Sequence, residues 1–150
     1  MRRPSRTTLS TLLALVAAGT LLLGACSSDT ADTATASVPP PESGKVVTLT
    51  PEQGAALMKD DPTAVVIDVR TPEEFAQGHI EGARNINLEG ATFTTDAGAL
   101  DKSATYVVYC RSGNRSGMAT KEMAAQGFTK VYDLGGIQAW QEAGQKVVTT

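Results

Sequence analysis

The hydrophobic and polar positions divide the chain into three parts. Residues 9–23 form an apolar stretch dominated by Leu, Ala and Val. Residues 27–45 contain almost no large apolar side chain, so this segment cannot bury enough surface to offset the entropy lost on ordering. From residue 46 onward, short apolar runs alternate with amphipathic ones. We therefore expect the folded part of the chain to span residues 46–150.

Five short runs predict β-strands in this folded part. The run AVVIDV at residues 64–69 is almost continuously apolar, as expected for a strand that is covered on both faces of a sheet. The other four runs are shorter or more mixed in composition. The predicted strands are residues 46–49, 64–69, 83–88, 105–109 and 130–134.

Helix signals lie between the predicted strands. Thr50 and Thr71 are each followed directly by Pro, and by Gln or Glu three residues after the Thr. This arrangement is the signature of a capped helix start. Residues 116–126 predict another helix, in which Ala119 and Met123 lie one turn apart on the same face.

The last predicted elements are a turn at Gly135-Gly136 and a short helix through Trp140. Strands and helices that alternate at this spacing indicate an α/β domain, with a mainly parallel central sheet of about five strands flanked by helices. Ligands of such sheets bind beyond the carboxyl ends of the strands, where loops lead into helices. The loop after Tyr109 is therefore the first candidate for a site.

Charge and composition remove several function classes. The chain has 13 basic and 16 acidic side chains, and its first 25 residues hold three of the basic ones (Arg2, Arg3 and Arg6) and no acid. Residues 26–150 are therefore net acidic, so no nucleic-acid partner is expected. With two cysteines and one histidine, the chain lacks the ligands for a zinc site of the usual four-ligand kind.

The N-terminus has the layout of an export signal. A basic and polar start precedes the apolar stretch at residues 9–23, which is shorter than the ~20 residues needed to cross a bilayer. The stretch ends in Leu23-Gly24-Ala25-Cys26, which resembles a bacterial lipoprotein box. The resemblance implies that residues 1–25 are a lipoprotein signal peptide. A plain secretory signal and a retained membrane helix are the alternatives.

Lipidation of Cys26 would set the location of the protein. Two or more acyl chains, such as palmitate, anchor a protein stably, whereas a single chain holds it only marginally. Residues 26–45 would then be the lipidated cysteine and a disordered tether. We expect an exported protein, anchored by lipid to the bacterial cell membrane, with its folded domain on the extracytoplasmic side.

The loop after Tyr109 contains a cysteine in a setting that suits catalysis. Cys110 ends an apolar strand and precedes a helix, where successive backbone N–H groups can curl around an anion. Arg111 and Arg115 flank it, and these features together favour the nucleophilic thiolate. A buried, inert thiol is the alternative, but it would require apolar neighbours.

The other residues of the loop supply flexibility and hydrogen-bond donors. Gly113 permits backbone torsions that a bulky residue resists, so the loop can wrap around the sulfur. Ser112 and Ser116 offer hydroxyl groups, and the planar guanidinium of Arg115 suits an oxyanion such as a sulfonate. The loop is therefore a candidate site for a small sulfur-containing anion.

Four segments of the chain form a recognisable set in a fixed order: Asp68–Phe75, Gly78–Ala83, Cys110–Ser116 and Gly135–Trp140. Together they resemble the rhodanese family, and the resemblance covers residues 46–150. It implies a rhodanese-like three-layer domain and a single-domain sulfurtransferase. Cys110 would take a sulfane sulfur from thiosulfate or a similar donor, become a persulfide, and pass the sulfur to cyanide or a thiol.

The resemblance also implies roles within the loop. The backbone N–H groups of Arg111, Ser112, Gly113, Asn114, Arg115 and Ser116 would stabilise the thiolate and the persulfide, and the two arginines would hold the anionic donor. No cofactor is implied, and the partners would be the anion, a thiol or cyanide acceptor, or a protein that accepts sulfur. The alternative is a sulfur-carrier or persulfide-binding module with little turnover of its own. Cysteine phosphatases of related fold have one residue more between Cys and Arg, which disfavours that class.

Several residues outside the loop have both a structural and a functional interpretation. Asp68 either orients the site or pairs with Arg70, Arg84 or backbone donors, since an unpaired charge at the end of an apolar strand is costly. The Arg70 side chain points either at the mouth of the site or into solvent. His79 could act as a base for a Cys–His pair, but a structural role is favoured, and Trp140 is expected in the core.

Overall fold

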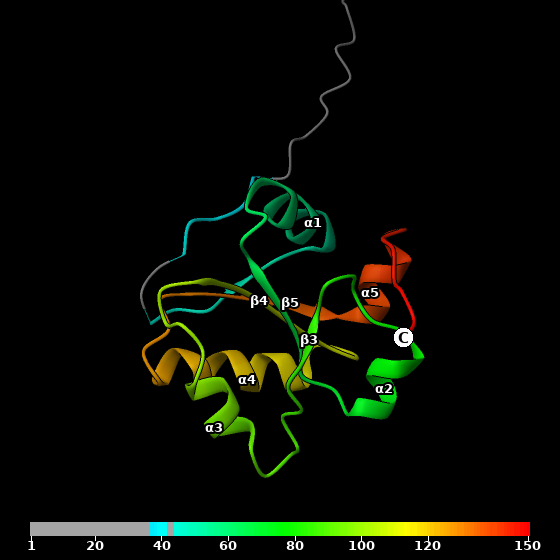
Figure 1. The fold of residues 1–150 in the computed structure, drawn as a ribbon. Coiled ribbons are helices and arrows are strands. Elements are labelled where there is room, and N and C mark those ends of the chain that lie inside the picture. Colours follow the sequence, from blue (N-terminus) through cyan, green and yellow to red (C-terminus); the bar gives the residue numbers. More distant parts are fainter. Residues whose placement is uncertain (1–36, 42–43) are drawn as a thin grey trace, which may run out of the picture. The chain divides into compact units, whose positions relative to one another are not determined.

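The computed structural model describes residues 37–41 and 44–150 (Figure 1). The predicted signal peptide, the predicted lipidation site Cys26 and most of the predicted tether lie outside the described residues. Among the residues that are described, no helix is long and apolar enough to cross a membrane.

A parallel five-stranded sheet forms the centre of the domain. Its strands lie in the order β1-β5-β4-β2-β3, and each neighbouring pair is parallel. All five predicted strands are confirmed, although the two edge strands are shorter than expected because each pairs on one side only. The bounds are β1 Val47–Thr48, β2 Val65–Asp68, β3 Arg84–Asn85, β4 Thr105–Cys110 and β5 Lys130–Gly136.

The helices begin where the sequence carries capping signals. Thr50 forms a complete capping box with Gln53, and Thr71 forms one with Glu74. In both helices the cap hydroxyl accepts a hydrogen bond from a backbone N–H that the helix leaves unpaired. The bounds are α1 Pro51–Asp60, α2 Pro72–Gln77, α3 Phe93–Gly98, α4 Asn114–Ala125 and α5 Ile137–Glu142.

Two helices differ from the prediction, one in its start and one in its existence. Helix α4 begins two residues earlier than predicted, because Gly113 adopts a left-handed backbone conformation at φ 100° and the helix starts directly after it. Helix α3 was not predicted, since its N-cap Thr92 makes no side-chain capping bond. It is held instead by burial of Phe93 and Ala97 against the sheet.

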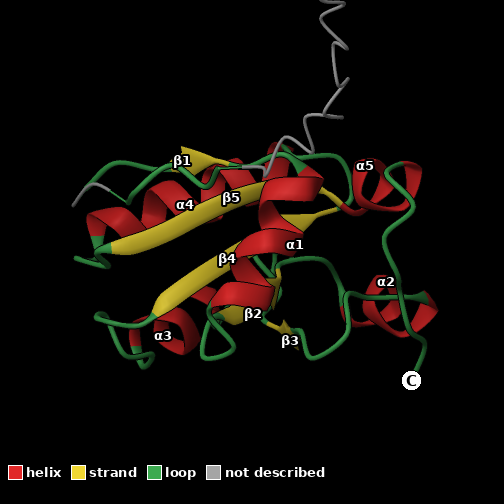
Figure 2. Cartoon of the chain, turned by 90° about the horizontal axis from the view of Figure 1, so that it is seen from above, coloured by secondary structure: helices red, strands yellow, loops and turns green. Residues whose placement is uncertain are grey.

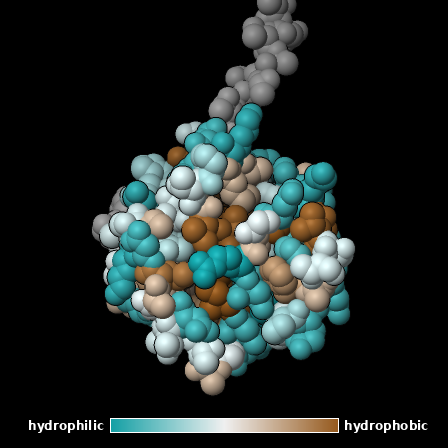
Figure 3. Space-filling view, in the orientation of Figure 1, coloured by the Kyte–Doolittle hydropathy of each residue, from teal (hydrophilic) through white to brown (hydrophobic). Residues whose placement is uncertain are grey.

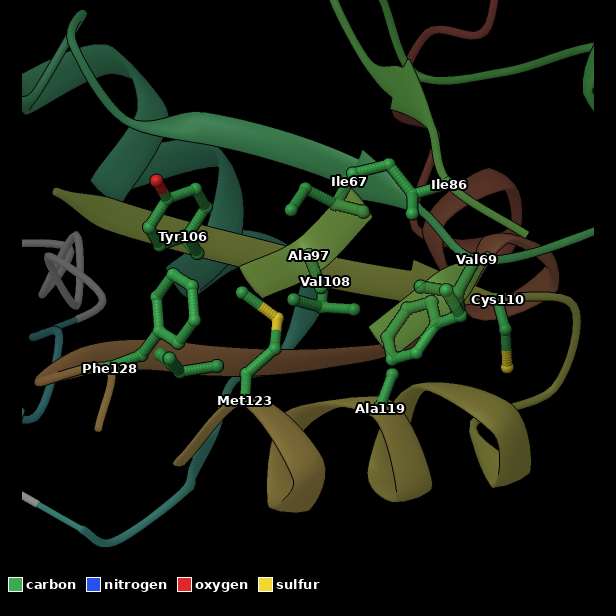
Figure 4. Close-up of a cluster of buried hydrophobic side chains, with 12 residues drawn as sticks. Ile67, Val69, Ile86, Ala97, Tyr106, Val108, Cys110, Ala119, Met123 and Phe128 are labelled. Atoms are coloured by element: carbon green, nitrogen blue, oxygen red, sulfur yellow. The ribbon is translucent and has the colours of Figure 1, made fainter. Parts of the chain in front are cut away.

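The helices cover both faces of the sheet, as the predicted three-layer architecture requires (Figure 2). Successive side chains of β4 alternate between two cores. Tyr106, Val108 and Cys110 join a cluster with α3 and α4, whereas Val107 and Tyr109 join a cluster with α1 and α5. Figure 4 shows the first cluster between the sheet and the helix that carries Ala119 and Met123. Cys110 therefore ends a strand that is buried on both sides.

The described end of the predicted tether contacts the domain. The carbonyl of Ser37 accepts a hydrogen bond from Gln53 Nε2 at 2.9 Å, and that of Pro39 accepts one from the Tyr132 hydroxyl at 3.4 Å. Val38 packs against the core cluster beneath α1. Contacts with the domain thus begin before residue 46, the predicted boundary.

Candidate functional site

The loop between β4 and α4 lies at the carboxyl edge of the sheet, where the sequence placed the site. Cys110 is the last residue of β4, and its side chain is 1% exposed. Its sulfur points toward the start of the helix that carries Ala119 (Figure 4). Cys110 is a free thiol. The strand thus fixes the position of the sulfur, and the helix start supplies the polar side of its surroundings.

Two groups of the loop approach the sulfur. The backbone N–H of Gly113 donates to Cys110 Sγ at 3.1 Å, and Ser116 Oγ lies 3.8 Å from the same sulfur. The Ser116 hydroxyl is within donating distance of two carbonyls, those of Gly113 at 3.1 Å and Gly135 at 3.2 Å. Of the six predicted backbone donors, the Gly113 N–H bonds the sulfur in the described structure, whereas Ser116 approaches it through its side-chain hydroxyl. Ser116 also ties the loop to β5.

The end of β5 pairs with the end of β4 and contacts the cysteine loop. Leu134 is an extra residue in β5, so that Tyr109 pairs with Gly135 and Cys110 with Gly136. This bulge is held by Asp133, whose Oδ1 accepts a hydrogen bond from the Gly135 N–H at 2.9 Å. The predicted turn at Gly135-Gly136 is thus the bulged end of a strand. Asp133 is a supporting residue that no sequence pattern singled out.

Gly136 permits the loop to approach this strand closely. A Cβ atom at Gly136 would lie 2.7 Å from the carbonyl oxygen of Arg111 and 2.8 Å from the Cα atom of Ser112. Both distances are shorter than a normal contact between non-bonded atoms. Any larger residue would push the loop away from the sheet, so glycine is required at this position.

Arg115 is paired with carboxylates. Its guanidinium makes a two-pronged ion pair with Glu74 at 2.7 and 2.8 Å and a further contact with Glu89 at 3.1 Å. The hydrogen bonds that Arg115 donates to Glu74 lower the pKa of the Glu74 carboxyl and raise the pKa of the Arg115 guanidinium. The pair ties the start of α4 to α2. Arg115 is therefore already engaged by the protein itself.

Arg111, Ser112 and Asn114 form the exposed rim of the loop. Within the part of the chain that the structure describes, Arg111 has no carboxylate within ion-pair distance. It lines a cavity of about 220 Å³ together with Arg70 and Glu74. Of the two predicted anion-holding arginines, Arg111 is thus the one whose guanidinium is available.

Asp68 and Arg70 form a buried ion pair behind the site. The carboxylate of Asp68 is fully buried and accepts bonds from Arg70 Nε at 2.9 Å and from its Nη2. The same Nη2 donates to the Gly78 carbonyl at 2.6 Å. Burial alone would lower the pKa of Arg70. The hydrogen bonds to Asp68 and the negative charge of Asp68 act in the opposite direction, and together the pKa of Arg70 is raised. Asp68 thus pairs with Arg70 rather than with Arg84, which is exposed.

His79 and Trp140 make structural contacts. The His79 ring stacks on Phe75 with 3.8 Å between centroids, and its Nδ1 lies 3.0 Å from the Phe75 carbonyl. Its backbone pairs with Val148 in an isolated antiparallel bridge. Trp140 is buried and donates from Nε1 to the Lys146 carbonyl at 2.9 Å. These contacts agree with the structural interpretation of both residues.

Comparison with known proteins identifies relatives of the chain. The family profile of the rhodanese-like domain matches residues 50–143. The thiosulfate sulfurtransferase GlpE of Ectopseudomonas mendocina is 39% identical over 95 residues, which cover 62% of this chain and 83% of that protein. The thiosulfate sulfurtransferase PspE of Escherichia coli is 39% identical over 72 residues, covering 48% of this chain and 69% of that protein.

Solved structures show the same fold. A rhodanese-related protein from Thermoplasma volcanium is 31% identical and matches with a TM-score of 0.60, covering 69% of this chain and 99% of that one. The parallel five-stranded sheet with helices on both faces is therefore the rhodanese-like architecture that the sequence motifs implied. The family match covers well over half of the sequence and includes the whole cysteine loop. The chain belongs to the rhodanese-like domain family.

Proposed function

We propose that the protein is a sulfurtransferase that carries a sulfane sulfur as a persulfide on Cys110. The observation that supports this most directly is the hydrogen bond from the Gly113 N–H to Cys110 Sγ, in a loop that places the sulfur at the carboxyl edge of the sheet. Similarity to thiosulfate sulfurtransferases favours thiosulfate as the donor.

In the first step, the Cys110 thiolate attacks the outer sulfur of thiosulfate. A bond forms between Cys110 Sγ and that sulfur, and the original sulfur–sulfur bond breaks with its electron pair leaving on sulfite. The loop N–H groups stabilise the anionic persulfide, because backbone donors aimed at a sulfur need no reorganisation as charge develops. Arg111 attracts the donor, since its guanidinium has no ion-pair partner among the described residues.

In the second step, an acceptor thiol or cyanide attacks the outer sulfur of the persulfide. The bond to Cys110 Sγ breaks, and its electron pair restores the thiolate. Arg115, Ser116, Gly136 and Asp133 act as positioning residues in this proposal, because they hold the loop rather than the reacting atoms.

The test of this proposal separates an enzyme from a carrier. Purified protein with Cys26 replaced by Ser is incubated with thiosulfate, alone or with cyanide. The proposal expects release of sulfite in the first case and repeated production of thiocyanate in the second. A single turnover of sulfur per protein, with no further thiocyanate, would instead support the sulfur-carrier alternative. Cys110→Ser is the matched control for both measurements.

We also propose that the protein is exported and anchored by lipid at Cys26, with the domain on the extracytoplasmic side of the membrane. The support is the sequence Leu23-Gly24-Ala25-Cys26 after the apolar stretch. Mass spectrometry of the membrane-extracted protein would reveal an N-terminal Cys26 that carries acyl chains. A mature protein that starts at another residue, or that is recovered in the aqueous phase after detergent partitioning, would refute this.

A further inference from the structure

The polar cavity that Arg111 lines adjoins the cysteine loop. It lies between α2 and α5, which are neighbours at one end of the domain in both Figure 1 and Figure 2. Its volume is about 220 Å³, and Arg111, the residue directly after Cys110, forms part of its wall. Ile137 contributes an apolar side chain to the same wall. Because Cys110 pairs with Gly136, the residue before Ile137, the cavity wall begins one residue from the cysteine on both strands.

The free polar groups of this cavity are mainly hydrogen-bond donors. Gln77 comes from the end of α2, and Gln138 and Gln141 come from α5. Within the described part of the chain, the side-chain amides of these three glutamines make no hydrogen bond, and Arg111 makes no ion pair. Four exposed side chains whose N–H groups make no bond to the described part of the protein thus line one space.

The other two charged residues of the wall are already engaged. Both oxygens of Glu74 accept hydrogen bonds from Arg115, and Arg70 is bound to Asp68 and to the Gly78 carbonyl. Neither needs a ligand for its charge to be balanced. The charge that remains available in the cavity is therefore the positive charge of Arg111.

We infer that this cavity binds the carboxylate and amide groups of a small cysteine-derived thiol that accepts the sulfur. A planar carboxylate matches the parallel N–H groups of the Arg111 guanidinium, and the amide N–H groups of Gln138 and Gln141 donate to the same carboxylate. The Gln77 amide is left to pair with the peptide-like group. Thiosulfate alone would leave much of the space unfilled. The inference rests on the proposed function, because it assigns the acceptor of the same persulfide.

The chemistry of the transfer is balanced without a further reactant. The sulfur of the acceptor attacks the outer sulfur of the Cys110 persulfide, and a new sulfur–sulfur bond forms on the acceptor. The bond to Cys110 Sγ breaks, and the electron pair returns the cysteine to its thiolate. The thiol proton of the acceptor ends on the persulfide product. The carboxylate stays bound to the cavity and takes no part in the reaction.

A pair of probe molecules isolates the carboxylate. N-acetylcysteine and N-acetylcysteinamide differ only in that the second has an amide in place of the carboxylate. With thiosulfate as donor, the wild-type protein should show the lower KM for N-acetylcysteine. Replacing Gln138 and Gln141 together by Ala should raise that KM by about tenfold, as expected for lost hydrogen bonds to a charged group. The KM for the amide should change much less.

Gln126→Ala is the matched control, since this glutamine lies at the far end of α4 and does not line the cavity. Equal KM values for the two probes, or an equal rise for both in the double variant, would overturn the inference. Titration of S-methyl-N-acetylcysteine, followed by NMR, gives a readout that requires no sulfur transfer. It should shift signals of α2 and α5 in the wild type but not in the double variant. If it does so while thiosulfate leaves no sulfur on wild-type Cys110, the proposed function fails but the cavity assignment does not.

Discussion

Replacing Gly136 by Ala tests whether the close approach of β5 holds the cysteine loop in place. The added Cβ would lie 2.7 Å from the Arg111 carbonyl oxygen and 2.8 Å from Ser112 Cα. A comfortable contact between such atoms is about 3.5 Å, so the loop must move by about 0.7 Å. Both obstructing atoms belong to the backbone, so no side-chain rotation relieves the clash.

The displacement should affect both stability and rate. Overpacking of this kind costs about 1–3 kcal/mol of unfolding free energy. It also moves the Gly113 N–H that lies 3.1 Å from the sulfur. Because misplacement of reacting groups by about 1 Å costs on the order of 100-fold in rate, we expect persulfide formation to slow by about 10- to 100-fold.

The assay is single-turnover release of sulfite from thiosulfate, together with urea unfolding. Gly127→Ala is the matched control: its φ of +94° imposes backbone strain, but it lies at the opposite end of α4 from the loop. The control should lose about 1 kcal/mol of stability and keep its rate. A wild-type rate in Gly136→Ala would refute the view that this contact positions the loop.

Three further predictions follow from the ion pairs and the lipid signal. Glu74→Gln should destabilise the domain at pH 7, because Arg115 lowers the pKa of the Glu74 carboxyl in the folded protein and the charged carboxylate therefore stabilises the fold. The difference from the wild type in urea unfolding should shrink as the pH falls below the ordinary value of 4.5 and through the lowered pKa, and a pH-independent difference would contradict this. Asp68→Asn should lower the free energy of unfolding by about 3–5 kcal/mol, since it leaves the charge of the buried Arg70 unpaired. Combining it with Arg70→Met removes that charge and should restore part of the lost stability in the same urea assay. Cys26→Ser should release the protein from the membrane fraction, as followed by immunoblotting, whereas retention in that fraction would contradict the lipid anchor.

The features that were predicted correctly from the sequence depend on short-range patterns. The capping boxes at Thr50 and Thr71 are complete within four residues, and both helices begin where expected. The alternation of Val107 and Val108 between two cores follows from the two-residue period of a strand that is buried on both faces. The position of Cys110 follows from the general rule that sites lie beyond the carboxyl ends of parallel strands.

The features that were missed depend on contacts between distant residues. Arg115 binds Glu74, which lies 41 positions away in the chain. The residues next to Arg115 in the sequence suggested that it holds an anion, and they gave no indication of this ion pair. The bulge at Leu134 is visible only in the register against β4. Helix α3 has no side-chain capping bond and is stabilised by burial of Phe93 in the hydrophobic core. Each of these requires the tertiary arrangement to be known.

One face of the domain mixes polar and apolar residues. On this face, hydrophobic residues form several separate groups with hydrophilic residues between them (Figure 3). Among the described residues, Met118 is the exposed large hydrophobic side chain, at 59% exposure.

The most direct test of the central proposal is the mass of the intact protein after reaction with thiosulfate. The proposal predicts that the wild-type domain gains one sulfur atom, that peptide mapping locates it on Cys110, and that a thiol or cyanide removes it. Cys110→Ser should gain none. A wild-type protein that gains no sulfur, or that carries it at a residue other than Cys110, would contradict the account.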